Sequence, residues 1–486
     1  YSMGEIPYYV YEFFKKGIED GNNYYSLSQT RSRSAAFFAN ATYSYKGRYT
    51  VNGTARYEGT NRMGKSRSAR WLPTWNVSGA WNAHEEKFFS NLTSVLSHFT
   101  LKASYSLTAD RGPADVTNSQ AIITSYSPYR PFTSIQESGL YIKELENSEL
   151  TYEKKHELNI GADMGFLNNR INLAVDWYKR NNYDLIGIVN TQGAGGQILK
   201  YANIASMKSH GIEFTLSTKN IKTKDFNWNT DFIFSNAKNE VTDLKQNANV
   251  MELISGNGFA KQGYPVRGLF SIPFVGLDKD GIPVIINEKG EATSTDINFQ
   301  ERQNTGFLKY EGPTDPTITG SLGNMFSYKG FRLNLFITYS FGNVIRLNPV
   351  FKAYYSDLTA MTREFKNRWT LPGDEAKTNV PAILSKRMYD SNEDLKYAYN
   401  AYNYSTERIA KGDFIRLKEI SLAYDFPKAW INPLKLTDLS LKVQATNLFL
   451  IYADDKLNGQ DPEFFNAGGV ASPVPRQFTI TLRLGL

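Results

Sequence analysis

Apolar residues alternate with polar or small residues along most of this 486-residue chain. The segment INLAVDW, residues 171–177, places an apolar side chain at every second position, and the same spacing recurs over 331–341 and 439–445. It continues to the end of the chain, over 478–486. Successive side chains of a strand point to opposite faces, so a period of two predicts strands with one apolar face. We therefore expect an all-β protein.

Composition agrees with strands and does not exclude a membrane. Aromatic residues make up 14% of the chain, with 31 Tyr and 30 Phe, and such residues favour strands. The mean hydropathy is −0.44, and there is no apolar run of the roughly 18 residues that a membrane-spanning helix needs. A β-barrel needs an apolar residue only at alternate positions, so low hydropathy is compatible with lipid. The absence of cysteine excludes disulfides.

Alternation and turn residues together predict about thirteen strands. Their expected ranges are 34–45, 48–58, 73–83, 98–108, 152–166, 170–180, 206–217, 226–237, 318–328, 330–343, 412–426, 437–450 and 476–486.

The connections between these strands alternate between short and long. Tight links are expected at 46–47, 167–170, 219–225 and 329–330, and long ones at 109–151, 181–205, 238–317, 344–411 and 451–475. The 84–97 link is longer than the other links expected at the same end of the sheet. Short turns at one end and long loops at the other are typical of outer-membrane barrels, with turns in the periplasm and loops outside. The pattern favours an antiparallel transmembrane β-barrel over a sandwich.

Counting strand directions back from the C-terminus indicates a larger barrel. If the last strand descends to the periplasm, an odd number of strands places residues 1–33 in an extracellular loop. Outer-membrane barrels usually have an even number of strands and both ends inside. We therefore expect residues 1–486 to be the C-terminal part of a single barrel whose first strands are absent from this chain.

The charge distribution and the spacing of the histidines argue against nucleic-acid binding, metal sites and enzyme activity. The net charge is +7, but Lys and Arg are scattered, which favours a solvated surface or anionic lipid head groups over nucleic acid. The four histidines, His84, His98, His156 and His210, are far apart in sequence without metal-ligand spacing. No nucleophile arrangement or phosphate loop stands out. We expect no enzyme activity, no metal site and no cofactor.

Several motifs in order carry a resemblance to a known family. They are LPTWNVSGAW at 72–81, NIASMKSHGIEF at 203–214, YPVRGLFSIPFVGLDKDGIPV at 264–284, GDFIRLKEISLAYDFP at 412–427 and TNLFLIYADDKLNGQDPEF at 446–464. From about Arg31 to Leu486 the chain resembles the C-terminal barrel portion of SusC/RagA-type TonB-dependent outer-membrane transporters.

The resemblance implies a bacterial outer-membrane barrel of about 22 strands, surrounded by the lipid bilayer and lipopolysaccharide. It also implies an N-terminal plug and TonB-contacting segment, both absent here, and a SusD-like surface lipoprotein as a lid. Such transporters import oligomeric nutrients, glycans or peptides, and the resemblance admits a dimer of transporter–lid pairs. Two alternatives stay open: a barrel recruited as a structural component of a larger outer-membrane assembly, and a passive pore.

The loop 344–411 is rich in residues that suit a polar oligomer. Aromatic faces stack on sugar rings or peptide side chains, and tyrosine hydroxyls add hydrogen bonds. A short helix is expected around Met361 and Phe365. The alternative is that these aromatic residues pack the loop over the barrel or against the lid. The candidate substrate contacts are Arg368, Trp369, Tyr354, Tyr355, Tyr397, Tyr399, Tyr402 and Tyr404.

Acidic residues gather in the last long loop. Asp454, Asp455, Asp461 and Glu463 could hold a cation such as Ca²⁺ or contact the lid. The alternative is that Asp461-Pro462-Glu463 caps and shapes the loop. The DKDG motif at 278–281 lacks the remaining acids of a calcium loop and is expected to be an ordinary turn.

Side chains on the two faces of the strands have different expected roles. Residues for the aromatic girdles at the membrane interfaces are Trp177, Trp228, Tyr328 and Tyr339. Residues expected to face the interior and pair with the plug are Asp176, Glu213, Arg332, Asn334, Lys442 and Arg483.

Overall fold

A computed structural model describes most of the chain. The described residues are 12–13, 15–17, 32–112, 121–126, 138–191, 193, 199–350, 361–465 and 475–485. Most of the predicted extracellular loop 1–33 lies outside them. Among the described residues, no helix is both long enough and apolar enough to cross a membrane.

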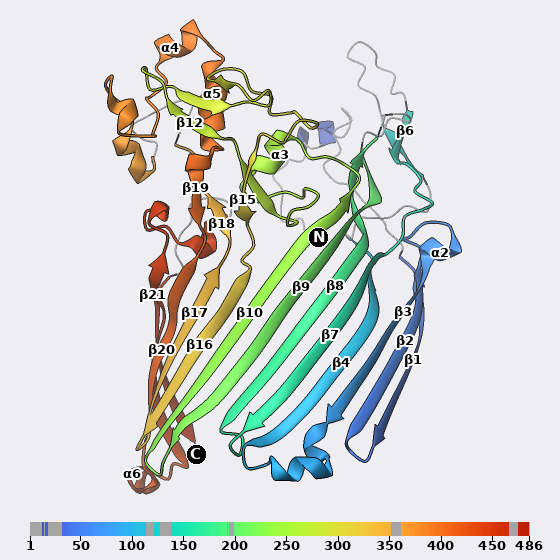
Figure 1. Cartoon of the computed structure of the whole chain (residues 1–486), viewed down its shortest axis with the longest axis vertical. Helices are drawn as coiled ribbons and strands as arrows, with labels where there is room; N and C mark the ends of the chain where they lie inside the picture. The colour runs from blue at the N-terminus through green and yellow to red at the C-terminus, as the bar shows by residue number, and fades with distance from the viewer. Residues whose placement is uncertain are drawn as a thin grey trace.

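The strands form one antiparallel sheet of thirteen, in which chain order is also spatial order (Figure 1). Each predicted strand has one counterpart, so the predicted all-β fold is confirmed. The strands are β1 (Ser34–Tyr45), β2 (Tyr49–Thr60), β3 (Trp71–Asn82), β4 (Leu96–Asp110), β7 (Glu153–Phe166), β8 (Ile171–Asn190), β9 (Leu199–Lys222), β10 (Phe226–Leu244), β16 (Ile318–Tyr328), β17 (Phe331–Phe341), β20 (Phe414–Asp425), β21 (Asp438–Ala453) and β22 (Gln477–Gly485).

The strand register aligns the apolar positions of all these strands on one face. Leu422 of β20 lies opposite Leu333 on one side and Val443 on the other, and Val443 lies opposite Ile480 of β22. Residues paired across strands share a face, so these form a continuous apolar belt. The belt is exposed: Ile480 is 73% accessible and Val443 48%. An exposed belt of this kind requires lipid around it, because a soluble sandwich would bury it.

The opposite face of the sheet carries charges and amides. Lys102 Nζ lies 2.6 Å from Asp163 Oδ2, and Arg332 Nη2 lies 2.8 Å from Asp425 Oδ1. Asn52 donates a 2.6 Å hydrogen bond to Thr42 across the β1–β2 pair. Polar residues on one face and apolar residues on the other are the arrangement of a barrel wall with a wet interior.

Two of the short turns at one end of the sheet have residues in left-handed backbone conformations. Lys46 and Gly47 have φ of 52° and 69°, and Lys329 and Gly330 have φ of 44° and 91°. These conformations match the twist of two-residue hairpins. The 83–95 connection is the long exception expected from the sequence, and contains 3-10 helices at Ala83–Glu85 and Lys87–Asn91. The β20–β21 connection carries α6 (Lys428–Ile431).

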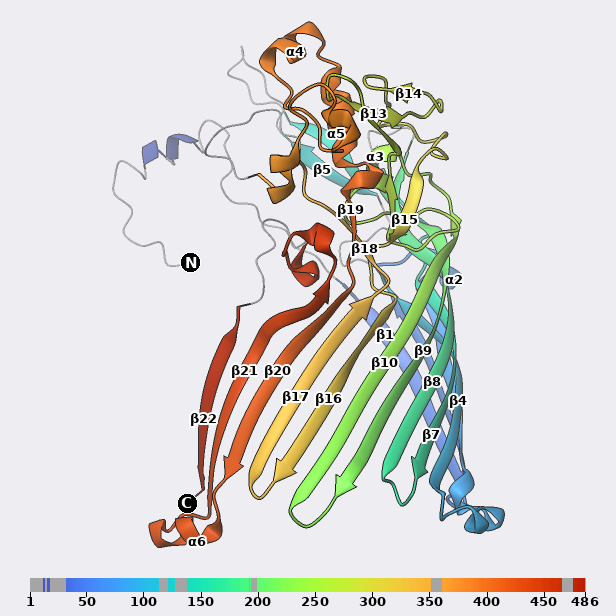
Figure 2. The same ribbon diagram turned by 60° about the vertical axis from the view of Figure 1, so that its left-hand side comes forward.

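Long connections lie at the other end and hold the remaining elements (Figures 1 and 2). These are α2 (Arg67–Arg70), β5 (Ile122–Tyr126), β6 (Gly139–Glu144), α3 (Val250–Ile254), β11 (Gly268–Ser271), β12 (Phe274–Leu277), β13 (Pro283–Ile286), β14 (Ala292–Thr293), β15 (Lys309–Pro313), β18 (Val344–Arg346), α4 (Lys386–Ser391), α5 (Leu395–Asn403) and β19 (Ile409–Lys411), with 3-10 helices at Arg363–Asn367, Asp374–Ala376, Thr406–Arg408, Asp455–Leu457 and Pro462–Phe464.

The prediction of a long loop over residues 181–205 is wrong. Strand β8 continues to Asn190 and β9 begins at Leu199, so most of this segment is a projecting hairpin. Strand β10 likewise runs on to Leu244. The apolar alternation ends where lipid ends, but the backbone hydrogen bonds of the ladder continue without apolar side chains. Sequence periodicity therefore underestimates strand length outside the membrane.

Candidate functional site

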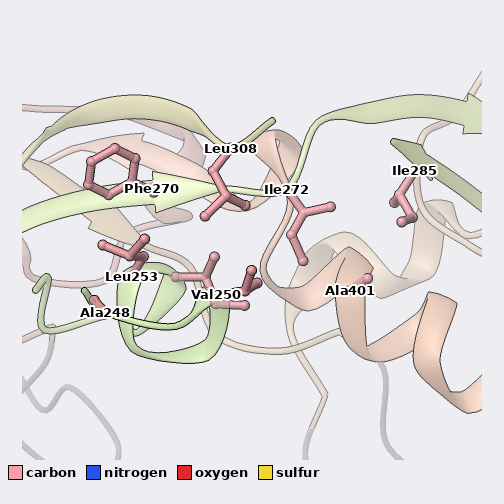
Figure 3. Packing of buried hydrophobic residues seen from close by; sticks show 9 residues of the cluster. Ala248, Val250, Leu253, Phe270, Ile272, Ile285, Leu308 and Ala401 are labelled. Carbon is pink, nitrogen blue, oxygen red and sulfur yellow. The ribbon is translucent and has the colours of Figure 1, made fainter. Parts of the chain in front are cut away.

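The two longest connections, 245–317 and 342–413, fold together over the outer end of the sheet (Figure 2). Their shared core includes Val250 and Ile254 of α3, Ile272 after β11, and Ala401 of α5, each accessible over no more than 1% of its surface. Figure 3 shows side chains of α3, β11 and α5 meeting in this core. Burying a valine or isoleucine side chain contributes roughly 1.5–3 kcal/mol. The loops are thus a folded cap rather than free tethers.

Two buried arginines connect segments of the cap that are distant in sequence. Arg346 of β18 donates to the backbone oxygens of Ser405, at 3.0 Å, and Phe270, at 2.5 Å. Arg408 pairs with Glu364 at 2.5 Å and is 2% exposed. Burial lowers the pKa of Arg346 to about 9. Carbonyl acceptors offset part of the desolvation cost of these guanidinium groups.

The DKDG segment forms the turn between β12 and β13, as predicted. The Oδ1 atom of Asp278 accepts 2.9 Å hydrogen bonds from the backbone N–H groups of Asp280 and Ile282. Gly281 has φ of +73°, and a Cβ there would lie 2.5 Å from the Trp369 ring. A glycine is therefore required both by the turn and by the close approach of Trp369.

The predicted tyrosines separate into different environments. Tyr354 and Tyr355 lie outside the described residues. Tyr399 and Tyr402 of α5 are only 1% and 2% exposed, and Tyr402 packs edge-on against Phe274 with 5.4 Å between ring centroids. Burial raises the pKa of the Tyr402 hydroxyl. Tyr404 is the residue that follows α5, and the Arg346 guanidinium lies 5.8 Å from its ring centroid.

Tyr397 and the Arg368-Trp369 pair lie nearer the surface. Tyr397 is 40% exposed and lines a cavity of about 440 Å³ with Asp296, Asn298 and Asp394. Trp369 donates from Nε1 to Glu375 Oε2 at 2.9 Å. Arg368 follows the 3-10 helix Arg363–Asn367, which begins near the expected short helix, and its guanidinium lies 5.1 Å from the Phe365 ring centroid.

The acidic residues of the last loop already have protein partners. Asp461 pairs with Arg416 at 2.5 Å with both side chains buried, and Glu463 lies 3.3 Å from Arg416 Nε. Asp454 accepts a 2.8 Å hydrogen bond from the Lys411 N–H, and Asp455 begins the following 3-10 helix. Within the described ranges, no three His, Cys, Asp or Glu residues are arranged to hold a metal ion. A cation or lid contact at this loop stays a prediction.

The histidines are not all separated in space. The ring centroids of His84 and His98 are 4.1 Å apart beside the 83–95 connection. Their separation of 14 residues is closed by the turn between β3 and β4. His84 Nδ1 is bonded to the Phe99 backbone oxygen at 3.0 Å, which gives it a structural partner.

Sequence reasoning missed a cavity on the polar wall. It has a volume of about 640 Å³, lies at the outer ends of β2, β3 and β4, and is lined by Thr54, Arg56, Glu58, Asn76, Asp110 and Arg111, among others. Arg56 pairs with Glu58, and Arg111 lies 3.8 Å from the same carboxylate. The sequence feature that could have located this cavity is the set of polar residues in the alternating pattern of these strands. It places Arg56 and Glu58 on the face opposite the apolar belt. Such a wall can hydrogen-bond a polar chain.

Comparison with known proteins identifies the family. The TonB dependent receptor-like, beta-barrel model matches residues 7–448. TonB-dependent receptor SusC of Bacteroides thetaiotaomicron is 26% identical, over 98% of this chain and 47% of its own length. TonB-dependent receptor P3 of Formosa agariphila is 25% identical, over 88% of this chain and 41% of its own length. This chain therefore spans about half the length of the curated relatives it matches.

The solved structures agree in fold. The RagAB peptide transporter superposes with a TM-score of 0.74 and 23% identity, over 94% of this chain and 48% of that chain. The "open-open" state of the RagAB peptide importer gives the same TM-score. With its two-faced, thirteen-stranded sheet and its match over most of the sequence, the chain belongs to the TonB-dependent receptor-like β-barrel family of the bacterial outer membrane.

Proposed function

We propose that this chain forms part of a transporter that imports oligomeric nutrients, glycans or peptides, across the outer membrane by TonB-dependent coupling. The observation that carries the proposal is the two-faced sheet, apolar toward lipid and polar within, with the 640 Å³ cavity at its outer mouth. A folded loop cap on the same end adds surfaces where cargo can be held before it enters. The relatives named SusC and RagAB support this assignment.

We also propose that the sheet closes with further strands into a complete barrel. Strands β1 and β22 are at the two ends of the strand order, and β1 is exposed along its whole length. An unpaired strand edge cannot remain in the hydrocarbon, because its N–H and C=O groups have no water to bond. Further strands, a plug inside the barrel and a TonB-contacting segment would complete the protein.

The third part of the proposal is a SusD-like surface lipoprotein that covers the cap. Exposed Tyr397 and the Arg368-Trp369 pair lie on the loop connection where such a lid and its cargo would meet. Affinity purification of the full protein from outer membranes in mild detergent is expected to recover a lipoprotein in a one-to-one ratio. Recovery of a stable assembly without such a lid would favour a structural role instead.

Uptake of labelled oligosaccharides and oligopeptides tests the transport function. Wild-type cells should accumulate one of the two classes, and loss of either the transporter or TonB should abolish the uptake. The variant R56Q/E58Q/R111Q removes three of the charged side chains that line the wall cavity and should reduce uptake several-fold, whereas K65Q, in the exposed Lys65–Glu146 pair, should not. Uptake that persists without TonB would indicate a passive pore.

A further inference from the structure

Three adjacent strands carry a row of basic side chains on the lipid-facing side of the sheet. Lys179 of β8 lies directly opposite His210 of β9, and His210 lies directly opposite Lys238 of β10. Together these three residues form the basic row. Each of them is exposed. Their place on the apolar face follows from period two, because Trp177 and Ile212, two positions away, belong to the apolar belt.

The basic row marks the outer boundary of the belt on these strands. Trp177 and Ile212 are paired with each other and are 38% and 39% exposed, as belt residues are. Two positions nearer the loops the chain changes from these apolar side chains to Lys179 and His210. The loop end faces outward in this family, so the row lies level with the head groups of the outer leaflet.

The basic row concentrates positive charge at the outer boundary of the belt, with Lys179 and Lys238 on either side of His210. A neighbouring carboxylate, Glu240, is already 3.1 Å from Lys208, the residue two positions from His210. The three lysines Lys179, Lys208 and Lys238 outnumber this glutamate by two. Within the part of the chain that the structure describes, the three side chains of the basic row make no hydrogen bond or ion pair.

We propose that the basic row binds a phosphate group of the phosphorylated glycolipid that forms the outer leaflet. Ammonium groups are strong phosphate donors, and basic clusters beside a membrane span recognise anionic head groups. The acyl chains of the same lipid would lie along Trp177 and Ile212, so one molecule would satisfy both the charges and the belt. The inference rests on the orientation of the barrel and is independent of its cargo.

The test compares bound lipid in wild-type protein and in K179Q/H210Q/K238Q. Both are purified as the full protein from outer membranes in mild detergent, and bound lipid is identified by native mass spectrometry and quantified by organic phosphate. Wild-type barrels should carry at least one phosphorylated glycolipid. After washing, the amount of glycolipid bound to the triple variant should be lower by about tenfold or more, because the variant lacks the basic side chains that attract the anionic head group.

Two further variants keep the result interpretable. K222Q/K224Q removes basic residues at the opposite, periplasmic end and should leave glycolipid binding unchanged. K179R/H210K/K238R keeps the charge and should restore binding, which separates lost recognition from a folding defect. Equal glycolipid on wild type and K179Q/H210Q/K238Q would overturn the proposal. Wild-type barrels that carry only glycerophospholipid, or no lipid, would overturn it as well.

Discussion

Several charged residues in the outer loops of this protein bind other parts of the same chain. Asp461 and Glu463 hold Arg416, and Arg346 holds the backbone of a neighbouring loop. A sequence pattern of clustered acids or aromatic residues cannot separate such structural partners from ligand contacts, because both uses need the same side chains. Among the predicted substrate contacts that the structure describes, Tyr397 lines a cavity.

The buried Arg416–Asp461 pair predicts a large effect of one small change. D461A removes the buried carboxylate partner of Arg416 and leaves only the more exposed Glu463 beside the guanidinium, which costs on the order of 3 kcal/mol. Hydrogen exchange of residues 454–465 should rise markedly in D461A and stay close to wild type in D455A, since Asp455 is exposed. Added Ca²⁺ should not change either result. Calcium-dependent protection in wild type would instead support a cation site.

The turn that holds Trp369 predicts a response to acid. Hydrogen bonds from the Leu371 backbone and Thr370 lower the pKa of Asp374, and the bond from Trp369 lowers the pKa of Glu375. A lowered carboxyl pKa means that the stabilisation is present above the ordinary value of about 4 and is lost as pH falls through the lowered value.

The emission of Trp369, taken as the difference between wild type and W369F, should therefore be constant from neutral pH to about pH 4 and change below it. E375Q keeps an acceptor for the indole N–H but does not titrate, so it should lose most of this change. Emission that shifts between pH 5 and 7, or not at all, would contradict the assignment.

At the scale of elements, strands were predicted far better than the structures between them. Helix α5 was missed, although Leu395, Ala398, Tyr399 and Tyr402 have helical spacing and form its buried face. Tyrosine side chains suit either a ligand contact or the buried face of a helix, so residue type alone does not distinguish the two. The small sheets of the cap have strands of two to six residues, too short to show a period.

The shared core of the cap predicts that the cap can unfold locally while the strands of the barrel stay folded. I272A empties a fully buried site between α3, β12 and α5, and should cost about 2–4 kcal/mol of cap stability. V275A, in the same segment, removes a side chain that is 58% exposed and should cost little. Limited proteolysis should cut I272A between residues 245 and 317 faster than V275A, with the strands intact. Equal cleavage would argue against a shared core.

At the scale of the whole molecule, the two faces of the sheet predict opposite responses to charge. Ile480 of β22 lies opposite Val443, both within the apolar belt, whereas Thr479 lies opposite Gln444 on the polar face. A lysine on the lipid face near the bilayer midplane costs roughly 2–4 kcal/mol, and a lysine toward the interior costs little.

The matched pair I480K and T479K measures this difference directly. I480K should reduce the amount of heat-resistant, folded barrel in outer membranes, and T479K should leave it close to the wild-type amount. The reverse order would mean that the belt faces the interior, and would contradict the fold assignment. Equal, small effects would indicate that β22 is not in contact with lipid.

The sequence by itself determined the strand count, the order of the strands and the face that each side chain takes. These features are local, because each strand pairs with the next along the chain and the side-chain pattern repeats every two residues. The tertiary structure alone decided which loop residues meet. Arg346 bonds Phe270 across 76 positions, and Arg416 bonds Asp461 across 45. Contacts between such distant residues depend on how the loops fold over one another, and no periodicity in the chain encodes them.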